Sequence, residues 1–148
     1  MYSRNHLLLS VAVGAGAAWL LDLPVPWWAA VAIAAVVGVG IDVDHFLVAR
    51  LTTGEWAAVR RALANPRAVF VDQGALFEPG EIWPIQRLCS HVALAGPLVG
   101  GAWLVDAGLG LLLAAVLYAH LLSDLLWDVA RLDVYRERHA AYAGEGRD

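Results

Sequence analysis

The chain has 148 residues, which is enough for one domain with a single core but too few for two. Apolar residues make up 60% of it and charged residues 16%, whereas soluble domains have about 45–50% and about 25%. This composition excludes a disordered or fibrous chain and favours a membrane protein. The net charge is −4 and every basic residue is an arginine, so no footprint for a nucleic-acid backbone is expected.

Charge-free blocks predict four helices, over residues 7–21, 27–41, 91–105 and 109–122. Each block is shorter than the roughly 20 apolar residues that a bilayer core requires. The second block continues to residue 51 and the fourth to residue 129, however, with only a few ionisable side chains among apolar ones. We therefore expect an all-α protein, a four-helix transmembrane bundle forming one domain over residues 1–148. The first helix is expected to be retained, because no cleavage site follows it.

Residues 52–87, between the second and third predicted helices, are the one soluble-looking segment. Within residues 55–64, apolar side chains recur at helical spacing opposite Arg60 and Arg61. This pattern predicts a short amphipathic helix on the membrane surface, with both arginines on its polar face. The stretch 70–81 contains two glycines and a proline and is expected to be an ordered loop.

The arginines indicate an orientation in the membrane. They precede the first helix, lie in or beside the 52–87 segment, or follow the fourth helix. The other two loops contain no arginine but do contain Asp22 and Asp106. By the positive-inside rule we expect a multi-pass protein of the cell membrane, with both termini and the 52–87 segment in the cytoplasm.

Ionisable side chains within or beside the apolar blocks are the most informative feature of the sequence. A carboxylate at the centre of a spanning helix costs roughly 2.5–3.5 kcal/mol, so several of them need compensating partners. In an up-and-down bundle, the start of helix one, the end of helix two, the start of helix three and the end of helix four share one side. The side chains at these four places are His6, Asp42, Asp44, His45, His91, His120 and Asp124.

The spacing of these residues suits metal ligation. His120 and Asp124 share a helix face at i and i+4, as do Asp42 and His45 at i and i+3. A single tetrahedral ion would not use all these ligands, so we predict two divalent ions bridged by a carboxylate. Zinc is the favoured ion, with manganese or iron as alternatives. The single cysteine, Cys89, leaves histidine and carboxylate as the ligands.

The favoured function is a membrane-embedded, metal-dependent hydrolase, in which a metal-activated water attacks a phosphoester or similar ester. Asp44 is the predicted catalytic residue, as a bridging ligand or as the base that orients the water, because it points away from the Asp42 and His45 face. Arg87 is predicted to hold a phosphate. The expected partners are the lipid bilayer and a small-molecule or lipid-like substrate.

Other interpretations remain open from the sequence. The protein could bind metal without catalysis, at a structural site or as a carrier. A carrier would need polar residues that continue toward the other face, and helices one and three offer only Ser10. His120 and Asp124 alone could also be a buried hydrogen-bonded pair. A soluble helical protein with a buried polar core is disfavoured by the composition.

At these residues the sequence resembles the family of membrane-bound metal-dependent hydrolases of the LexA-regulated inner-membrane type. More remotely, its ligand set is similar to that of the zinc phospholipase C and P1 nuclease group, which implies phosphoester cleavage. The sequence departs from the family pattern at Gln86, where a histidine is usual, and at Trp127-Asp128, where Thr-Pro is usual. Its arginine-only basic set and acidic balance resemble a haloarchaeal branch. The stretches that match are Arg4-Asn5-His6, Asp42-Val43-Asp44-His45 and His120-Leu121-Leu122-Ser123-Asp124.

Overall fold

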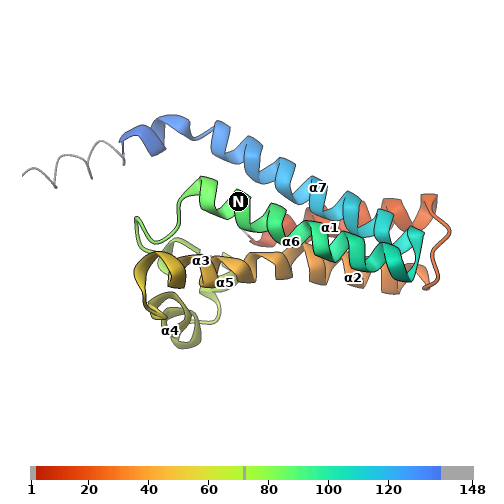
Figure 1. Ribbon diagram of the computed structural model, residues 1–148, viewed down its shortest axis with the longest axis horizontal. Helices are drawn as coiled ribbons and strands as arrows, with labels where there is room; N and C mark the ends of the chain where they lie inside the picture. Colours follow the sequence, from red (N-terminus) through yellow and green to blue (C-terminus); the bar gives the residue numbers. More distant parts are fainter. Residues whose placement is uncertain (1–2, 72, 138–148) are drawn as a thin grey trace, which may run out of the picture.

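The computed structural model describes residues 3–71 and 73–137, and this part of the chain is helical and contains no strand. The all-α prediction is therefore confirmed. Figure 1 shows the elements, which are α1 (Ser3–Leu20), α2 (Trp27–Gly40), the 3-10 turn η1 (Ile41–Val43), α3 (Asp44–Thr53), α4 (Ala57–Ala64), α5 (Ala68–Val71), η2 (Gln73–Ala75), α6 (Pro84–Val105) and α7 (Ala107–Val129).

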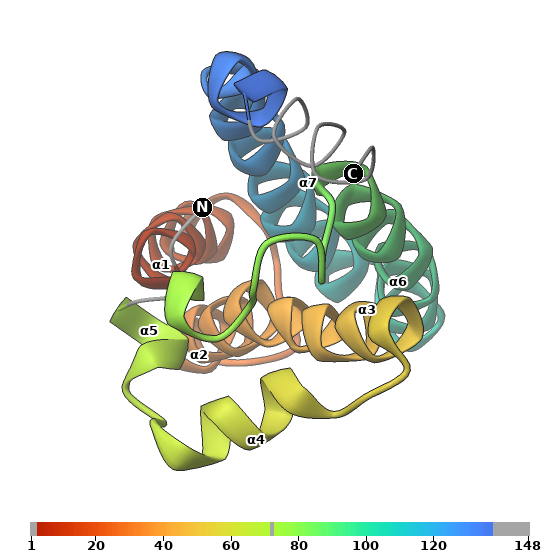
Figure 2. The ribbon, with the colours of Figure 1, turned by 90° about the vertical axis from the view of Figure 1, so that its left-hand side faces the viewer.

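The long helices α1, α2, α6 and α7 run lengthwise beside one another (Figures 1 and 2). Helix α1 packs against α2 and α7, and α6 packs against α7 and α3. Three segments are long and apolar enough to cross a membrane, namely Trp27–Thr53, Pro84–Val105 and Ala107–Val129. The first of these joins α2, η1 and α3 into one run. The coarse prediction of a helical membrane protein is thus supported by three helices, while a fourth spanning helix stays a prediction.

Capping side chains set where α6 and α7 begin. The Asp106 carboxylate accepts a hydrogen bond from the Leu109 backbone N–H at 3.0 Å, so α7 starts directly after α6 ends. Helix α6 has a proline, Pro84, in its first turn, and the Trp83 backbone N–H donates to Gln86 Oε1 at 2.9 Å. Helix α6 therefore begins at Pro84 rather than at residue 91, where the charge-free block starts.

Small residues fill the interior of the bundle at the end away from the 52–87 segment. The core there contains Ala17, Ala30, Ala34, Leu112 and Val116. A Cβ atom added at Gly14 would lie 2.5 Å from the Cβ of Ala34, so the backbones of α1 and α2 approach closely here. This part of the structure holds together by close packing of small side chains.

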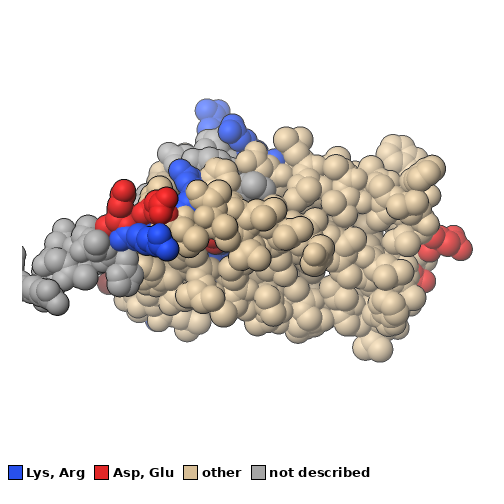
Figure 3. All heavy atoms as spheres, turned by 90° about the horizontal axis from the view of Figure 1, so that it is seen from above, with Lys and Arg blue, Asp and Glu red and all other residues tan. Residues whose placement is uncertain are grey.

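The outer surface of the bundle is apolar. Trp19 is 85% exposed and Leu104 is 89% exposed, and many other large apolar side chains are also exposed. Figure 3 shows an uncharged band along the molecule, with charged side chains gathered toward its two ends. A soluble protein rarely exposes so large an apolar patch, whereas a bilayer requires one.

The 52–87 segment folds as short helices at one end of the bundle (Figure 2). The predicted amphipathic helix is present as α4. Arg60 is exposed and pairs with Glu55 at 3.0 Å, but Arg61 turns inward. Its Nε donates to the Leu76 carbonyl at 2.7 Å, and its guanidinium also pairs with Glu78. Arg61 therefore organises the loop, and the membrane-surface face predicted for this helix stays a prediction.

Part of the predicted 70–81 loop is helical. Residues 68–71 form α5 and residues 73–75 form η2, while residue 72 lies outside the described residues. The Ser3 hydroxyl donates to the Val69 carbonyl at 3.1 Å and joins α5 to the start of α1. The segment thus packs on the same end of the bundle as the polar side chains described next.

Candidate metal centre

The predicted metal ligands are buried and come from α1, η1, α3, α6 and α7. Helix α1 contributes one histidine, the run through η1 into α3 contributes two aspartates and a histidine, α6 contributes a histidine, and α7 contributes a histidine and an aspartate. Most of them fall into two groups whose ligand atoms lie within 4.8 Å of one another. The first group is His6, Asp42, His120 and Asp124, and the second is Asp42, His45 and His91.

The first group joins α1, η1 and α7. His6 Nε2 lies 3.2 Å from Asp124 Oδ1, and His120 Nε2 lies 3.4 Å from Asp42 Oδ1 and 3.7 Å from Asp124 Oδ2. The rings of His6 and His120 stack with their centroids 3.8 Å apart. Two imidazoles and two carboxylates from three elements thus share one small buried volume.

The second group joins η1, α3 and α6. His91 Nε2 lies 3.4 Å from Asp42 Oδ1, and His45 Nε2 lies 3.8 Å from the same oxygen. The rings of His45 and His91 stack with their centroids 5.0 Å apart. Asp42 therefore belongs to both groups, and its Oδ1 lies near His120 of the first group and near both histidines of the second.

Several of these atoms are buried without a hydrogen-bond partner among the described residues. They include Nε2 of His45, His91 and His120, and both carboxylate oxygens of Asp42. Buried polar atoms are normally hydrogen-bonded, because leaving them unpaired costs free energy. Lone pairs of imidazole and carboxylate that converge in this way fit a divalent cation, which would satisfy all of them together.

The other ring nitrogen of two histidines is held from outside the groups. His120 Nδ1 lies 2.8 Å from the Gly38 carbonyl oxygen, and His91 Nδ1 lies 2.7 Å from Asp44 Oδ2. A carbonyl oxygen only accepts, so Nδ1 of His120 donates and its Nε2 keeps the lone pair that a metal requires. The Asp44 carboxylate favours the same tautomer of His91. Orienting contacts of this kind commonly support metal ligands.

Asp44, predicted to be a bridging ligand or a base, belongs to neither group. Asp42 and His45, three residues apart, belong to the same group, while Asp44 contacts His91 on α6. Its nearest group atom other than His91 is His45 Nε2, 3.9 Å from Asp44 Oδ1. Asp42 occupies the shared position, and Asp44 orients His91.

Arg87, predicted to bind phosphate, forms a polar network beside the first group. Its Nη2 donates to both oxygens of Asp128, at 2.8 and 2.7 Å, and its Nε lies 3.5 Å from Asp124 Oδ2. The Tyr135 hydroxyl donates to Asp128 Oδ1 at 2.9 Å. Burial, together with this hydrogen bond, raises the pKa of Tyr135 to about 12. The spacing of four residues between Asp124 and Asp128 shows from the sequence that they share a helix face. No sequence pattern indicated that Tyr135 would bind to Asp128.

Gln86, which stands where the resembled family usually has a histidine, belongs to neither group. Its side-chain oxygen is engaged with the Trp83 backbone at the start of α6. Gln86 therefore caps the start of α6.

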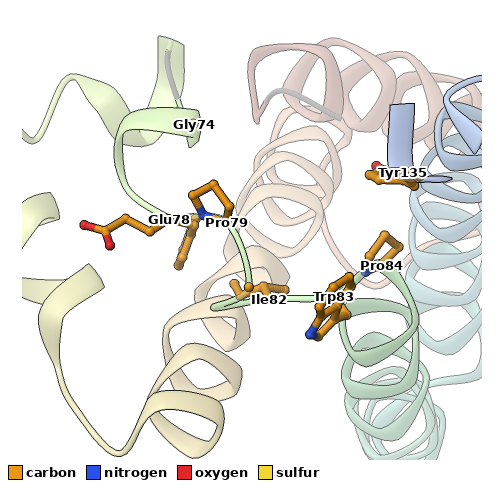
Figure 4. Close-up of a pocket in the computed structure, with 9 residues that line it drawn as sticks. Gly74, Glu78, Pro79, Ile82, Trp83, Pro84 and Tyr135 are labelled. Atoms are coloured by element: carbon orange, nitrogen blue, oxygen red, sulfur yellow. The ribbon is translucent and has the colours of Figure 1, made fainter. Parts of the chain in front are cut away.

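A separate cavity of about 230 Å³ lies beside Tyr135, between the loop at residues 74–84 and the start of α6. Figure 4 shows Trp83, Pro84 and Tyr135 on one side of it and Glu78 directed away from them. Glu78 pairs instead with Arg61, at 3.1 Å. No member of the two metal groups lines this cavity, so it is distinct from the candidate centre.

Comparisons with protein-family models, with curated proteins and with solved structures gave no match. The function proposed below therefore rests on the geometry of this chain's own residues.

Proposed function

We propose that the protein is a membrane-embedded hydrolase that uses two divalent cations to cleave a phosphoester or a similar ester. One observation carries the proposal. Asp42 Oδ1 has no hydrogen-bond partner among the described residues, yet it lies 3.4 Å from Nε2 of both His91 and His120. A carboxylate between two sets of histidines is the arrangement that a binuclear centre requires.

In this proposal, each of the two groups holds one ion and Asp42 contributes to both. The mixture of imidazole nitrogens and carboxylate oxygens suits zinc best, and it also suits manganese and iron. Such ions supply Lewis acidity, and they lower the pKa of water from 15.7 toward about 7. This is the chemistry that ester hydrolysis needs at neutral pH.

The chain's own residues have three tasks in the proposal. Asp44 and the Gly38 carbonyl hold the rings of His91 and His120, so that both Nε2 atoms face the ligand positions. Arg87 contacts Asp128 and Asp124 together, and so holds the Asp124 carboxylate beside the first group. The apolar helices around the cluster limit its access to water and strengthen these electrostatic interactions.

The proposal includes α1 as the fourth membrane-spanning helix and places both termini in the cytoplasm. Helix α1 packs along α2 and α7, and Leu8 and Trp19 on it are largely exposed, as in a helix that contacts lipid. The arginine-free loops at residues 22 and 106 lie at the end opposite the 52–87 segment, which supports this orientation.

The test is elemental analysis of detergent-purified protein, combined with hydrolysis of a panel of phosphoesters and phospholipids by the metal-loaded form. Asp42→Ala should lose both metal and activity. Asp133→Asn, which changes an exposed aspartate, is the matched control and should keep both. Protein that purifies without metal would contradict the proposal. Metal-loaded protein that cleaves nothing in the panel would instead favour a structural metal site.

A further inference from the structure

An apolar groove of about 470 Å³ runs between the α2–α3 run and α6. Its walls are mostly aliphatic, and one charged side chain, that of Asp44, also lines it. Much of the aliphatic wall is exposed, so the groove opens on the lipid-facing surface. The aliphatic wall includes Val37, Ile41, Leu47, Leu94 and Leu98.

Asp44 is the one charged side chain in the lining of the groove, between Ile41 and Leu47 on the α2–α3 run. Asp44 lies at the candidate metal centre, where its Oδ2 contacts His91 Nδ1. Val37 lies about 10 Å from Asp44 along the helix axis, at the rise of ~1.5 Å per residue in a helix. Leu98 is likewise two turns beyond His91 on α6. The groove therefore passes beside the metal groups and extends toward the middle of the bundle.

The Asp44 carboxylate offers an unpaired atom. Asp44 Oδ1 is buried and has no hydrogen-bond partner among the described residues. Its carboxylate is thus the point where the apolar groove meets the polar cluster. A ligand that matches both must carry a polar head and a hydrocarbon chain.

We propose that this groove binds the hydrocarbon chain of a membrane amphiphile, with the head of that amphiphile at the metal groups. The chain would lie along the bilayer normal, head toward the end of the bundle and tail toward its middle, as lipids already do. Close contact with the aliphatic walls supplies dispersion attraction along the chain. The position of the head rests on the proposed function, whereas chain binding does not.

Gly40 allows the groove to be filled without disturbing the centre. It lines the groove, and a Cβ added there meets nothing within 4 Å. Gly40→Leu should therefore block the groove. Gly16, on α1, is equally open and lies outside the groove, so Gly16→Leu is the matched control. Both changes replace glycine by a better helix former, and neither should destabilise its helix.

The experiment uses a lysophospholipid with a photoreactive diazirine in its acyl chain, mixed with purified protein in detergent. Peptide mapping should find the label on α2 and α6, near Val37 and Leu98. Gly40→Leu should lower this labelling roughly tenfold, equivalent to about 1.4 kcal/mol. Gly16→Leu should leave it unchanged. Equal labelling of the two variants, or label spread evenly over all helices, would overturn the proposal.

Two further measurements separate this proposal from the proposed function. Metal content and hydrolysis of a chain-free probe, p-nitrophenyl phosphate, should be the same in Gly40→Leu and Gly16→Leu. Groove labelling without any phosphoester cleavage would contradict the hydrolase but support the chain site. Cleavage of the chain-free probe, with labelling that Gly40→Leu does not change, would contradict the chain site alone.

Discussion

The two halves of the bundle are built from the same helices but filled with opposite kinds of side chain. Helix α7 shows this along one stripe, where Leu112 and Val116 are followed at the same spacing by His120, Asp124 and Asp128, all buried. In the half away from the 52–87 segment, small apolar residues pack closely. In the other half, buried polar atoms lack hydrogen-bond partners among the described residues. The first half is a packed apolar core, whereas the second brings together side chains that could hold a metal ion.

This difference implies that stability is unevenly distributed. Close packing holds the apolar half whether or not a cation is bound. In the polar half, burial of unpaired polar atoms and repulsion between the carboxylates oppose folding unless a cation compensates them. The predictions below test this contrast between the halves.

The largest effect is expected for Asp42→Ala. The change removes the carboxylate that both groups share, so the protein should lose most of its bound metal. Asp44→Asn alters only the contact behind His91, and it should weaken metal binding by about 10–100-fold, the usual effect of an orienting residue. Elemental analysis after dialysis at fixed free metal would measure both. If Asp44→Asn lost more bound metal than Asp42→Ala, Asp44 rather than Asp42 would be the bridging ligand.

Removal of metal should loosen one half selectively. Chelation should lower the melting temperature, because a cation at 100 times its Kd stabilises the native state by about 2.7 kcal/mol. Hydrogen exchange should then quicken around Asp42 and His91 but stay slow around Ala30 and Ala34. A uniform increase in the hydrogen-exchange rate along the bundle would mean that the two halves unfold as one unit. Unchanged exchange after confirmed metal loss would leave the cluster as an ordinary polar network.

The apolar half should respond to overpacking without any change at the centre. Gly14→Ala places a methyl group against Ala34, and it should cost about 1–3 kcal/mol of stability. Gly16→Ala meets open space and should be neutral or slightly stabilising. Denaturation of both variants in detergent would measure the difference. A change of metal content in Gly14→Ala would contradict the independence of the two halves.

The smallest effect is expected at Tyr135, which lies beyond the end of α7. Tyr135→Phe removes one hydrogen bond to Asp128 and should cost about 1 kcal/mol. Because the folded pKa is about 12, above the ordinary value of 10, the native state keeps this proton longer than the unfolded state does. The contribution of the Tyr135 hydrogen bond to the free energy of unfolding is present below pH 10 and is lost as the pH rises toward 12. Tyrosinate absorbance of wild type minus Tyr135→Phe should show this late ionisation; a midpoint near pH 10 would contradict it.

The sequence predicted the all-α class, and it predicted that the polar residues gather at one end of the helices. Ionisable side chains at the ends of apolar blocks are visible without a structure, and so are the i+3 and i+4 pairs. The contact of Asp44 with His91 was not predictable, because it depends on how α3 packs against α6.

Contacts that involve the backbone or distant residues were also beyond the sequence. The Gly38 carbonyl that holds His120 is a backbone atom, which no side-chain pattern reveals. Arg87 and Asp128 are 41 residues apart, and their pairing depends on how α6 and α7 pack. The early start of α6 required recognising Pro84 and Gln86 as a helix-initiating pair, since the charge-free pattern begins later.

The placement of the polar half at one end of the helices affects how the chain enters a membrane. On the apolar side of Asp42, His91 and Asp124, residues 27–41, 92–105 and 107–119 contain no charged side chain, so these stretches could lie in the hydrocarbon core. A newly made helix can insert while its carboxylates stay hydrated among the lipid headgroups, and it avoids the roughly 2.5–3.5 kcal/mol per charge at the bilayer centre. Assembly of the polar cluster can then follow as a later step, after the helices have found one another.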